Sequence, residues 1–164
     1  MQREANEVSN ILWRERQLLE LLVFKLEEEQ LVLAAGRTRW LPYATREVET
    51  VLGEIKRLEL DRAVHVDALA RVLDTGSSPT LRELTDHAPA PWDRIFAEHR
   101  RALLELAQEI DGVARSNRDL LTRGQQATRE ALASIGEIEL DVYTPSGTAQ
   151  ADRGAAFRII DEAM

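Results

Sequence analysis

The 164-residue sequence contains no cysteine, and only 5% of its residues are aromatic. The lack of cysteine excludes disulfide bonds and thiolate metal sites. Few aromatic residues together with many Leu, Ala, Glu and Arg residues are typical of long helices rather than of a sheet protein. For a chain of this length, we therefore expect one all-α domain.

The chain also lacks an excess of positive charge, because its 29 acidic residues outnumber its 21 basic ones and leave a net charge of −8. Proteins that bind DNA or RNA normally present a basic face, so nucleic acid is a poor partner for this chain. The most apolar stretch, residues 18–26, contains Glu20 and Lys25 and is too short to span a bilayer. No secretory signal is readable in the polar N-terminus. We expect a cytoplasmic protein with no direct membrane insertion.

The most regular pattern begins at Trp92 and continues to about Ile135. Its apolar and small residues alternate between steps of four and three, the heptad seam of a helix packed along partner helices. Such a helix would be roughly 65 Å long at about 1.5 Å per residue. Asn117 is a polar residue in this seam, interpreted either as a buried residue that fixes helix register or as a direct partner contact. His99 also lies on the seam, where we expect a packed histidine rather than a metal ligand.

Two more long helices are predicted before this one, over about residues 3–35 and 43–73. The first carries a wide apolar stripe, so we expect it to contact two neighbouring helices. Gly36 is the expected stop of the first helix, and residues 40–42 are the expected turn. The predicted seam of the second helix has Arg62 inserted among Val48, Leu52, Ile55, Val66, Leu69 and Leu73.

A short helix is predicted to begin with the capping box Thr80-Leu81-Arg82-Glu83, before a stiff elbow at residues 88–91. After Gly136 the composition changes: residues 137–143 alternate polar and apolar, which favours an extended segment. The small polar residues that follow favour mobility. The predicted fold is an elongated, mostly antiparallel all-α bundle or coiled coil of three long helices and one short helix. We expect a helical domain over residues 1–136 and a flexible C-terminal tail over residues 137–164.

No sequence motif for catalysis or cofactor binding is present. The sequence lacks a glycine-rich phosphate loop, a G-x-S-x-G elbow and an H-E-x-x-H zinc motif. A carboxylate di-iron site would need a Glu three residues before a His, and none of the three histidines has one. We therefore expect no enzyme activity, no metal and no cofactor.

Two local stretches carry a resemblance to a known family. Ser116-Asn117-Arg118-Asp119-Leu120-Leu121 looks like an Asn-x-x-Leu-Leu segment, and Val142-Tyr143-Thr144-Pro145-Ser146-Gly147 looks like a Tyr-x-x-x-Gly segment just past the last helix. Together with the order of the predicted helices, which covers nearly the whole length, these stretches make the sequence resemble the FlgN-like flagellar export chaperones. The sequence departs from the family by placing Thr-Pro-Ser between Tyr143 and Gly147, and by ending in an apolar piece where some relatives end basic.

The resemblance implies a chaperone that binds hook–filament junction proteins, the hook-associated proteins, before export. It would deliver them to the cytoplasmic domain of the export gate of the flagellar type III secretion apparatus. Tyr143 and Gly147 are the residues that the resemblance implies for docking on this gate. For binding of the terminal helix of the client, it implies Asn117, Leu120, Leu121, Phe157, Ile159 and Ile160.

An unfolded, amphipathic client terminus needs an apolar groove, and a helical bundle with a wide stripe offers one. An apolar tail on a linker could cover such a groove until a client arrives. The alternative is a structural or adaptor coiled-coil protein, for example a homodimer through the broad face of the first helix. That alternative explains the heptad seam equally well, but not the turn at residues 143–147.

Overall fold

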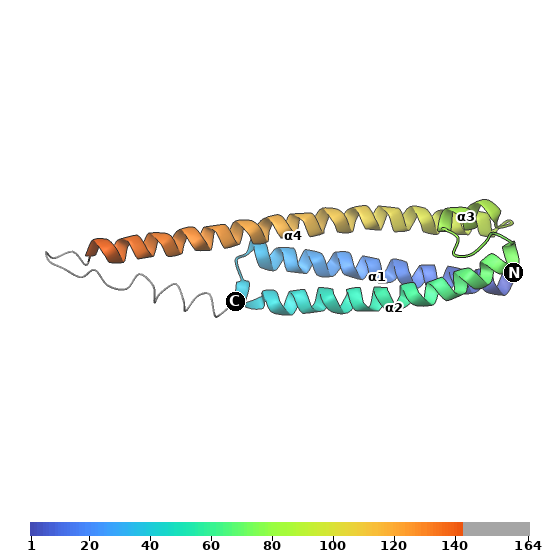
Figure 1. Cartoon of the computed structure of the whole chain (residues 1–164), viewed down its shortest axis with the longest axis horizontal. Helices are drawn as coiled ribbons and strands as arrows, with labels where there is room; N and C mark the ends of the chain where they lie inside the picture. The colour runs from blue at the N-terminus through green and yellow to red at the C-terminus, as the bar shows by residue number, and fades with distance from the viewer. Residues whose placement is uncertain (143–164) are drawn as a thin grey trace. The chain divides into compact units, whose positions relative to one another are not determined.

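The computed structural model describes the backbone of residues 1–142 and the side chains of residues 1–136. Within these residues there is no strand, which confirms the all-α prediction. The chain divides into two compact units, Met1–Gln126 and Ala127–Met164, and the bundle described below belongs to the first. The elements, shown in Figure 1, are α1 (Gln2–Ala34), the 3₁₀ turn η1 (Thr38–Trp40), α2 (Leu41–Leu73), α3 (Leu81–His87) and α4 (Trp92–Val142).

The end of α1 is set by Gly36, whose φ of 64° lies in the left-handed region that glycine adopts without strain. The Gly36 N–H donates to the carbonyl of Leu33, and the Arg37 N–H donates to that of Val32, both at 3.1 Å. These two bonds satisfy carbonyls that the helix itself leaves free. The predicted stop at Gly36 is confirmed. The following helix, α2, begins two residues earlier than expected, because Pro42 fits a first helical turn, where no N–H is needed.

The predicted capping box of the short helix α3 is also confirmed. The Thr80 hydroxyl accepts from the Glu83 N–H at 3.2 Å, and the Glu83 carboxylate accepts from the Thr80 N–H at 2.7 Å. Two otherwise free donors at the start of the helix are thereby satisfied. This local cap allows a helix of seven residues to form between two turns.

Side-chain bonds show that α1 and α2 run antiparallel. Glu15 in the first half of α1 pairs with Arg62 in the second half of α2, whereas Lys25 in the second half of α1 pairs with Glu47 early in α2, each at 2.8 Å. Figure 1 shows the two helices joined at one end by the short turn that contains η1.

In contrast, α1 and α4 run parallel to each other. Ser9 lies 3.1 Å from His99, and Gln30 donates to Ser116 at 2.9 Å, so both partners advance along the chain together. The direction follows from the topology, because α2 returns the chain to the end of the bundle where α1 began, and α3 and the elbow keep the start of α4 at that end. Consecutive long helices are therefore antiparallel, as predicted, and the first and last long helices are parallel.

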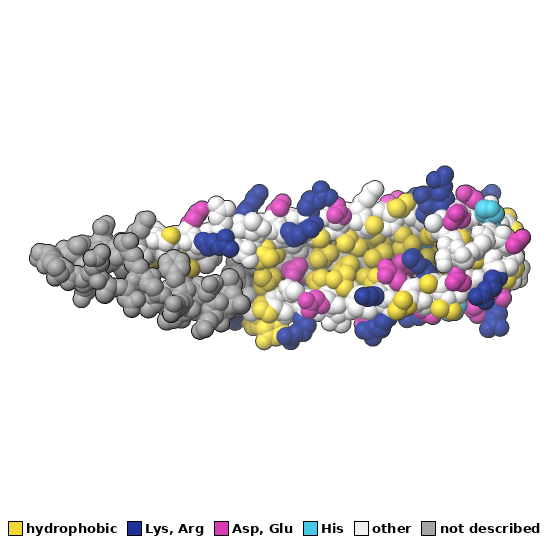
Figure 2. Space-filling view, viewed as in Figure 1, with side chains coloured by type: hydrophobic (Ala, Val, Ile, Leu, Met, Phe, Trp, Pro, Cys, Tyr) yellow, Lys and Arg dark blue, Asp and Glu magenta, His cyan; other side chains and the backbone are white. Residues whose placement is uncertain are grey.

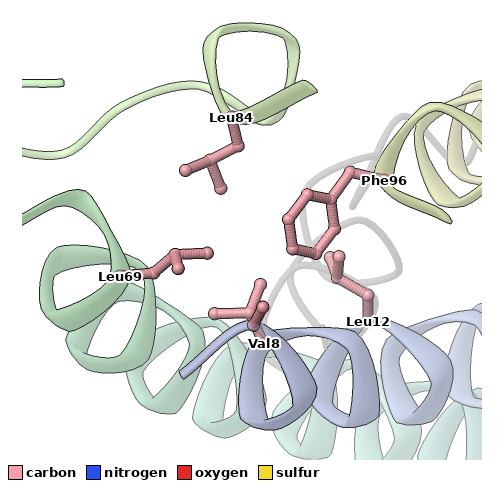
Figure 3. Packing of buried hydrophobic residues seen from close by; sticks show 6 residues of the cluster. Val8, Leu12, Leu69, Leu84 and Phe96 are labelled. Carbon is pink, nitrogen blue, oxygen red and sulfur yellow. The ribbon is translucent and has the colours of Figure 1, made fainter. Parts of the chain in front are cut away.

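One core cluster joins all four helices at the α3 end of the bundle. Figure 3 shows Val8 and Leu12 of α1, Leu69 of α2, Leu84 of α3 and Phe96 of α4 converging on one point. Burial of apolar side chains of this size contributes about 1.5–3 kcal/mol each relative to exposure. This cluster holds the short helix α3 and the start of α4 against the α1–α2 pair.

A second cluster lies farther along α1 and confirms that its wide stripe touches two neighbours. The cluster consists of Leu22, Leu26, Val48, Val51 and Ile55, with Leu18, Leu19, Ile110, Val113 and Ala114 packed against it.

The predicted seam of α2 is wrong at one position, Leu52, which is 47% exposed. Val51 and Leu58 are buried in its place.

The predicted extended segment over residues 137–143 is wrong where the structure describes it, because α4 continues to Val142. Continuing an existing helix needs no new nucleus, and the Glu, Ile and Leu residues after Gly136 are adequate helix formers. Gly136 itself costs about 1 kcal/mol in a helix, which weakens it without ending it. The predicted flexibility of the tail concerns residues that lie mostly outside the described part of the chain, and it stays a prediction.

Candidate functional site

Two pockets lie on the apolar side of α1, toward opposite ends of the bundle. One pocket of about 500 Å³ lies near the α1–α2 turn, and we call it the turn-end pocket. Another of about 390 Å³ lies beside α3, and we call it the α3-end pocket. Leu12 lines the second pocket, while Leu26 and Leu33, at the same heptad position of α1, line the first. These three leucines therefore lie on one side of α1, which we call the α2–α4 groove. Helix α4 lines only the turn-end pocket, and α3 with the loop before it lines the other.

Apolar side chains dominate the groove between its two pockets. Figure 2, seen as in Figure 1, shows a band of hydrophobic side chains between α4 and α2, bordered by charged ones. Between residues 41–73 and 92–123, no hydrogen bond or ion pair joins α2 to α4. Both helices bond to α1 instead. The groove thus has α1 as its floor and α2 and α4 as its walls, and Val113 of α4 packs against the same core cluster as Val51 of α2.

Polar side chains beneath the turn-end pocket join the three long helices. The Asn117 amide of α4 donates to the Leu26 carbonyl at 2.9 Å and to the Glu29 carboxylate at 3.2 Å. The other oxygen of Glu29 accepts from the Thr45 hydroxyl of α2 at 2.7 Å. Sliding α4 by one turn would break both Asn117 bonds, so the residue fixes the register of α4 against α1. The structure confirms that Asn117 is a buried seam residue.

A second polar link lies under the α3-end pocket. The Arg62 guanidinium of α2 donates to both oxygens of Glu15 at 2.8 Å, and the Glu15 side chain is only 8% exposed. Burial raises the pKa of Glu15, and the charge of Arg62 opposes that shift. The predicted polar position Arg62 in the α2 seam therefore has a specific partner, which sequence periodicity did not identify.

His99 packs at the contact of α4 with α1. Its Nε2 lies 3.1 Å from the Ser9 hydroxyl, and its ring meets Trp13 edge to face at 5.3 Å. Burial, with a smaller effect of the Arg16 charge, lowers the pKa of His99. The imidazole is consequently neutral at pH 7, as expected for a packed histidine.

The lowered pKa of His99 predicts acid-sensitive stability. As pH falls below about 6.5, a histidine in the unfolded chain gains a proton that the buried imidazole resists, so stability present above that pH is lost. We expect His99→Leu to lose part of the wild-type decline in the free energy of unfolding between pH 7 and pH 5. Urea unfolding at several pH values measures this decline. The control His87→Gln, at an exposed position, should keep the wild-type dependence, and an unchanged decline in His99→Leu would contradict the prediction.

The structure brings together some of the residues predicted to bind a client. Asn117 and Leu121 both line the turn-end pocket, where Leu121 is 41% exposed, and Leu120 is partly buried beside them. Sequence reasoning did not single out the other residues of this pocket, although their apolar members lie on the helix stripes that it described. The predicted residues Tyr143, Gly147, Phe157, Ile159 and Ile160 lie outside the described residues.

Comparison with protein families matches residues 1–151 to the FlgN protein family, which covers every described residue. The chain belongs to the FlgN family. FlgN is a chaperone family rather than an enzyme family, and membership points to a flagellar export chaperone. Comparisons with curated proteins and with solved structures gave no match. Within residues 1–142 of this FlgN-family chain, no helix has the length and apolar content that crossing a bilayer requires.

Proposed function

We propose that the chain is a flagellar type III export chaperone that holds the C-terminal helix of a hook–filament junction protein in the α2–α4 groove. It does so in the cytoplasm and delivers the client to the cytoplasmic domain of the export gate. The observation that carries the proposal is the open apolar groove in a FlgN-family chain, lined by Asn117 and Leu121 of the Asn-x-x-Leu-Leu stretch.

An amphipathic helix fits the groove because three helices already present apolar side chains toward it. Leu26 and Leu33 of α1, together with Leu41 of α2 and Leu121 of α4, line the turn-end pocket. A client helix laid between α2 and α4 would complete a four-helix arrangement and cover the exposed parts of Leu33, Leu41 and Leu121, while Leu26 is already buried. Full burial of a leucine from an exposed position contributes about 1.5–3 kcal/mol, and these partly exposed side chains gain less. Part of that gain offsets the loss of freedom on association.

Asn117 contributes to client binding from beneath the groove. Its bonds to Leu26 and Glu29 fix the position of α4 along α1. That position determines the distance between Leu121 and Leu41 across the pocket. Leu120, one residue before Leu121, packs on the seam and limits the rotation of α4. In this proposal, Leu121 is the residue of the stretch that touches the client.

The proposal gives the tail two separate roles. Tyr143 and Gly147 dock on the export gate, because a tyrosine next to a turn is an amphipathic anchor suited to a pocket. Phe157, Ile159 and Ile160 contact the client helix beyond the bundle. Because gate docking and client binding use different residues, one variant can lower the affinity for the client alone and another the affinity for the gate alone.

Leu121→Asp is expected to weaken binding of a junction-protein C-terminal peptide by about tenfold or more, because it replaces a leucine of the interface by a charge. Tyr143→Ala should leave that affinity nearly unchanged and lower the affinity for the cytoplasmic domain of the export gate. Isothermal titration calorimetry with the full chain measures both affinities.

Leu31→Asp is the matched control for the groove variant. Leu31 is 70% exposed at the same end of the bundle and lines neither groove pocket, so peptide affinity should stay at the wild-type value. Equal peptide affinity for Leu121→Asp and Leu31→Asp would remove the groove assignment, and unchanged gate affinity of Tyr143→Ala would remove the docking role. If light scattering shows a stable dimer whose mass does not change when the peptide is added, the coiled-coil adaptor is favoured instead.

A further inference from the structure

The two ends of the α2–α4 groove differ in charge. Between Gln30 and Arg46, the chain contains three arginines and no carboxylate, although the whole protein has a net charge of −8. Arg37, Arg39 and Arg46 are all exposed, and none of them forms an ion pair within residues 1–136. This segment comprises the end of α1, the turn that contains Arg37 and Arg39, and the start of α2 with Arg46, and Leu33 and Leu41 on the two sides of the turn line the turn-end pocket. The groove therefore ends against a basic turn.

Exposed aromatic rings accompany these arginines. The rings of Trp40 and Tyr43 lie 5.8 Å apart, and the Arg39 guanidinium lies 4.4 Å from the centre of the Trp40 ring. Both rings are largely open to solvent. Trp, Tyr and Arg are the residues that most often dominate the energy of protein interfaces. The basic turn thus has the composition of a contact surface as well as its charge.

Charges inside the turn-end pocket cancel, since it holds one carboxylate, Glu29, and one guanidinium, Arg118. Arg37 and Arg39 of the turn, which form no ion pair within residues 1–136, are therefore the charges that a ligand leaving this pocket meets next along the chain.

At the opposite end, the one charge of the α3-end pocket that has no ion-pair partner within residues 1–136 is negative. The α3-end pocket is lined by Arg62 and Glu59, and the charge of Arg62 is already matched by its bonds to Glu15. Glu59 is exposed and forms no ion pair within residues 1–136, so it remains as a negative charge beside α3. A ligand that reaches both pockets therefore meets the unpaired Arg37 and Arg39 at the turn and the unpaired Glu59 beside α3.

We propose that the client helix binds in one direction, with its C-terminus and free carboxylate at the basic turn and its N-terminus at α3. The inference rests on the proposed function and adds the polarity of the bound helix. A helix carries partial negative charge at its C-terminus and partial positive charge at its N-terminus, so both ends match the groove in this direction. The terminal carboxylate can also accept charge-assisted hydrogen bonds from Arg37 and Arg39.

The bound helix then runs parallel to α1 and α4 and antiparallel to α2. Leu12 and Leu33, which line the two pockets, are about 30 Å apart along α1 at about 1.5 Å per residue, so a client helix that reaches both pockets has about 20 residues. The last residues of that helix pack beside Trp40 and Tyr43.

Spin labelling of the client tests the direction. The probe is a synthetic peptide of the last 20 or so residues of a junction protein, with a nitroxide on a cysteine near its free C-terminus. The chaperone has no cysteine, so the label stays on the peptide. In NMR spectra of the complex with the full chain, we expect the indole signal of Trp40, at the turn, to broaden. The signal of Trp92, at the α3 end, should stay sharp, and a label at the peptide N-terminus should reverse the pattern.

Amidation of the peptide C-terminus tests the chemical cause. It removes one negative charge, and we expect affinity for the wild-type chain to fall about fivefold at low salt. The variant Arg37→Gln/Arg39→Gln should bind acid and amide peptides equally. The control Arg82→Gln/Arg94→Gln removes two exposed arginines from the other end and should keep the fivefold difference.

Outcomes of these experiments separate failure of the direction from failure of the proposed function. A peptide that binds with Trp92 broadened by the C-terminal label, with both indoles broadened or with neither, overturns the direction alone. Equal affinities of acid and amide peptides for the wild-type chain overturn the role of the basic turn. A peptide that does not bind at all overturns the proposed function, and the inference falls with it.

Discussion

Phe96→Ala is expected to lower the free energy of unfolding by about 4 kcal/mol, because it leaves a cavity where four helices meet. Phe96 is 0% exposed and packs among Val8, Leu12, Leu69 and Leu84. The loss combines the transfer energy of the ring with the contacts that its neighbours lose. Urea unfolding followed by circular dichroism measures it, and the melting temperature should fall by roughly 10 °C for a chain of this size.

The matched control for this change is Phe24→Ala. Phe24 is 52% exposed on α1, so the same truncation should cost less than about 1 kcal/mol there. Phe96 also holds the start of α4 against α3, and amide hydrogen exchange in α3 should therefore accelerate in Phe96→Ala. Similar losses of stability in the two variants would show that the α3-end cluster does not hold the bundle together.

Arg62→Met is expected to cost about 3 kcal/mol at pH 7, because it leaves the buried carboxylate of Glu15 without its partner. The cost should depend on pH in a definite direction. Burial already raises the pKa of Glu15 above its ordinary value, and loss of the Arg62 charge removes the effect that opposes this rise. A raised pKa in the folded state means that stability is retained below the ordinary pKa, about 4.3, and lost as pH rises through the folded value. Urea midpoints should therefore show the deficit of Arg62→Met shrinking as pH falls from 7 toward 4.

Two comparisons make the interpretation specific. Arg57→Met removes an arginine of α2 that bonds to its own helix at Gly53, and it should change stability by less than about 0.5 kcal/mol. In the double variant Glu15→Leu/Arg62→Met, apolar side chains replace both charges, and stability should return to the wild-type value or exceed it. A double variant as unstable as Arg62→Met would mean that the cost comes from packing of the arginine stem rather than from the unpaired carboxylate.

The candidate site illustrates how far sequence patterns lead. The heptad seam of residues 92–135 identified Asn117 as a polar residue in a packed position, and the structure buries it as expected. Its partners, the Leu26 carbonyl and Glu29, lie about ninety residues earlier, and periodicity within one helix says nothing about such distant contacts. Leu52 shows the same limit, because its spacing fits the seam while the structure leaves it 47% exposed and buries Val51 instead.

Local chemistry determined the secondary structure of the bundle from the sequence alone. Gly36 ends α1 and the pair Thr80 and Glu83 starts α3, because both signals act through bonds within a few residues. Tertiary structure alone decided that α4 lies parallel to α1, that Arg62 neutralises Glu15, and that two pockets stay open on the apolar side of α1. These features depend on how separate helices are set side by side, and the same apolar stripe can be sealed by a neighbour or left as a groove without any change in its spacing.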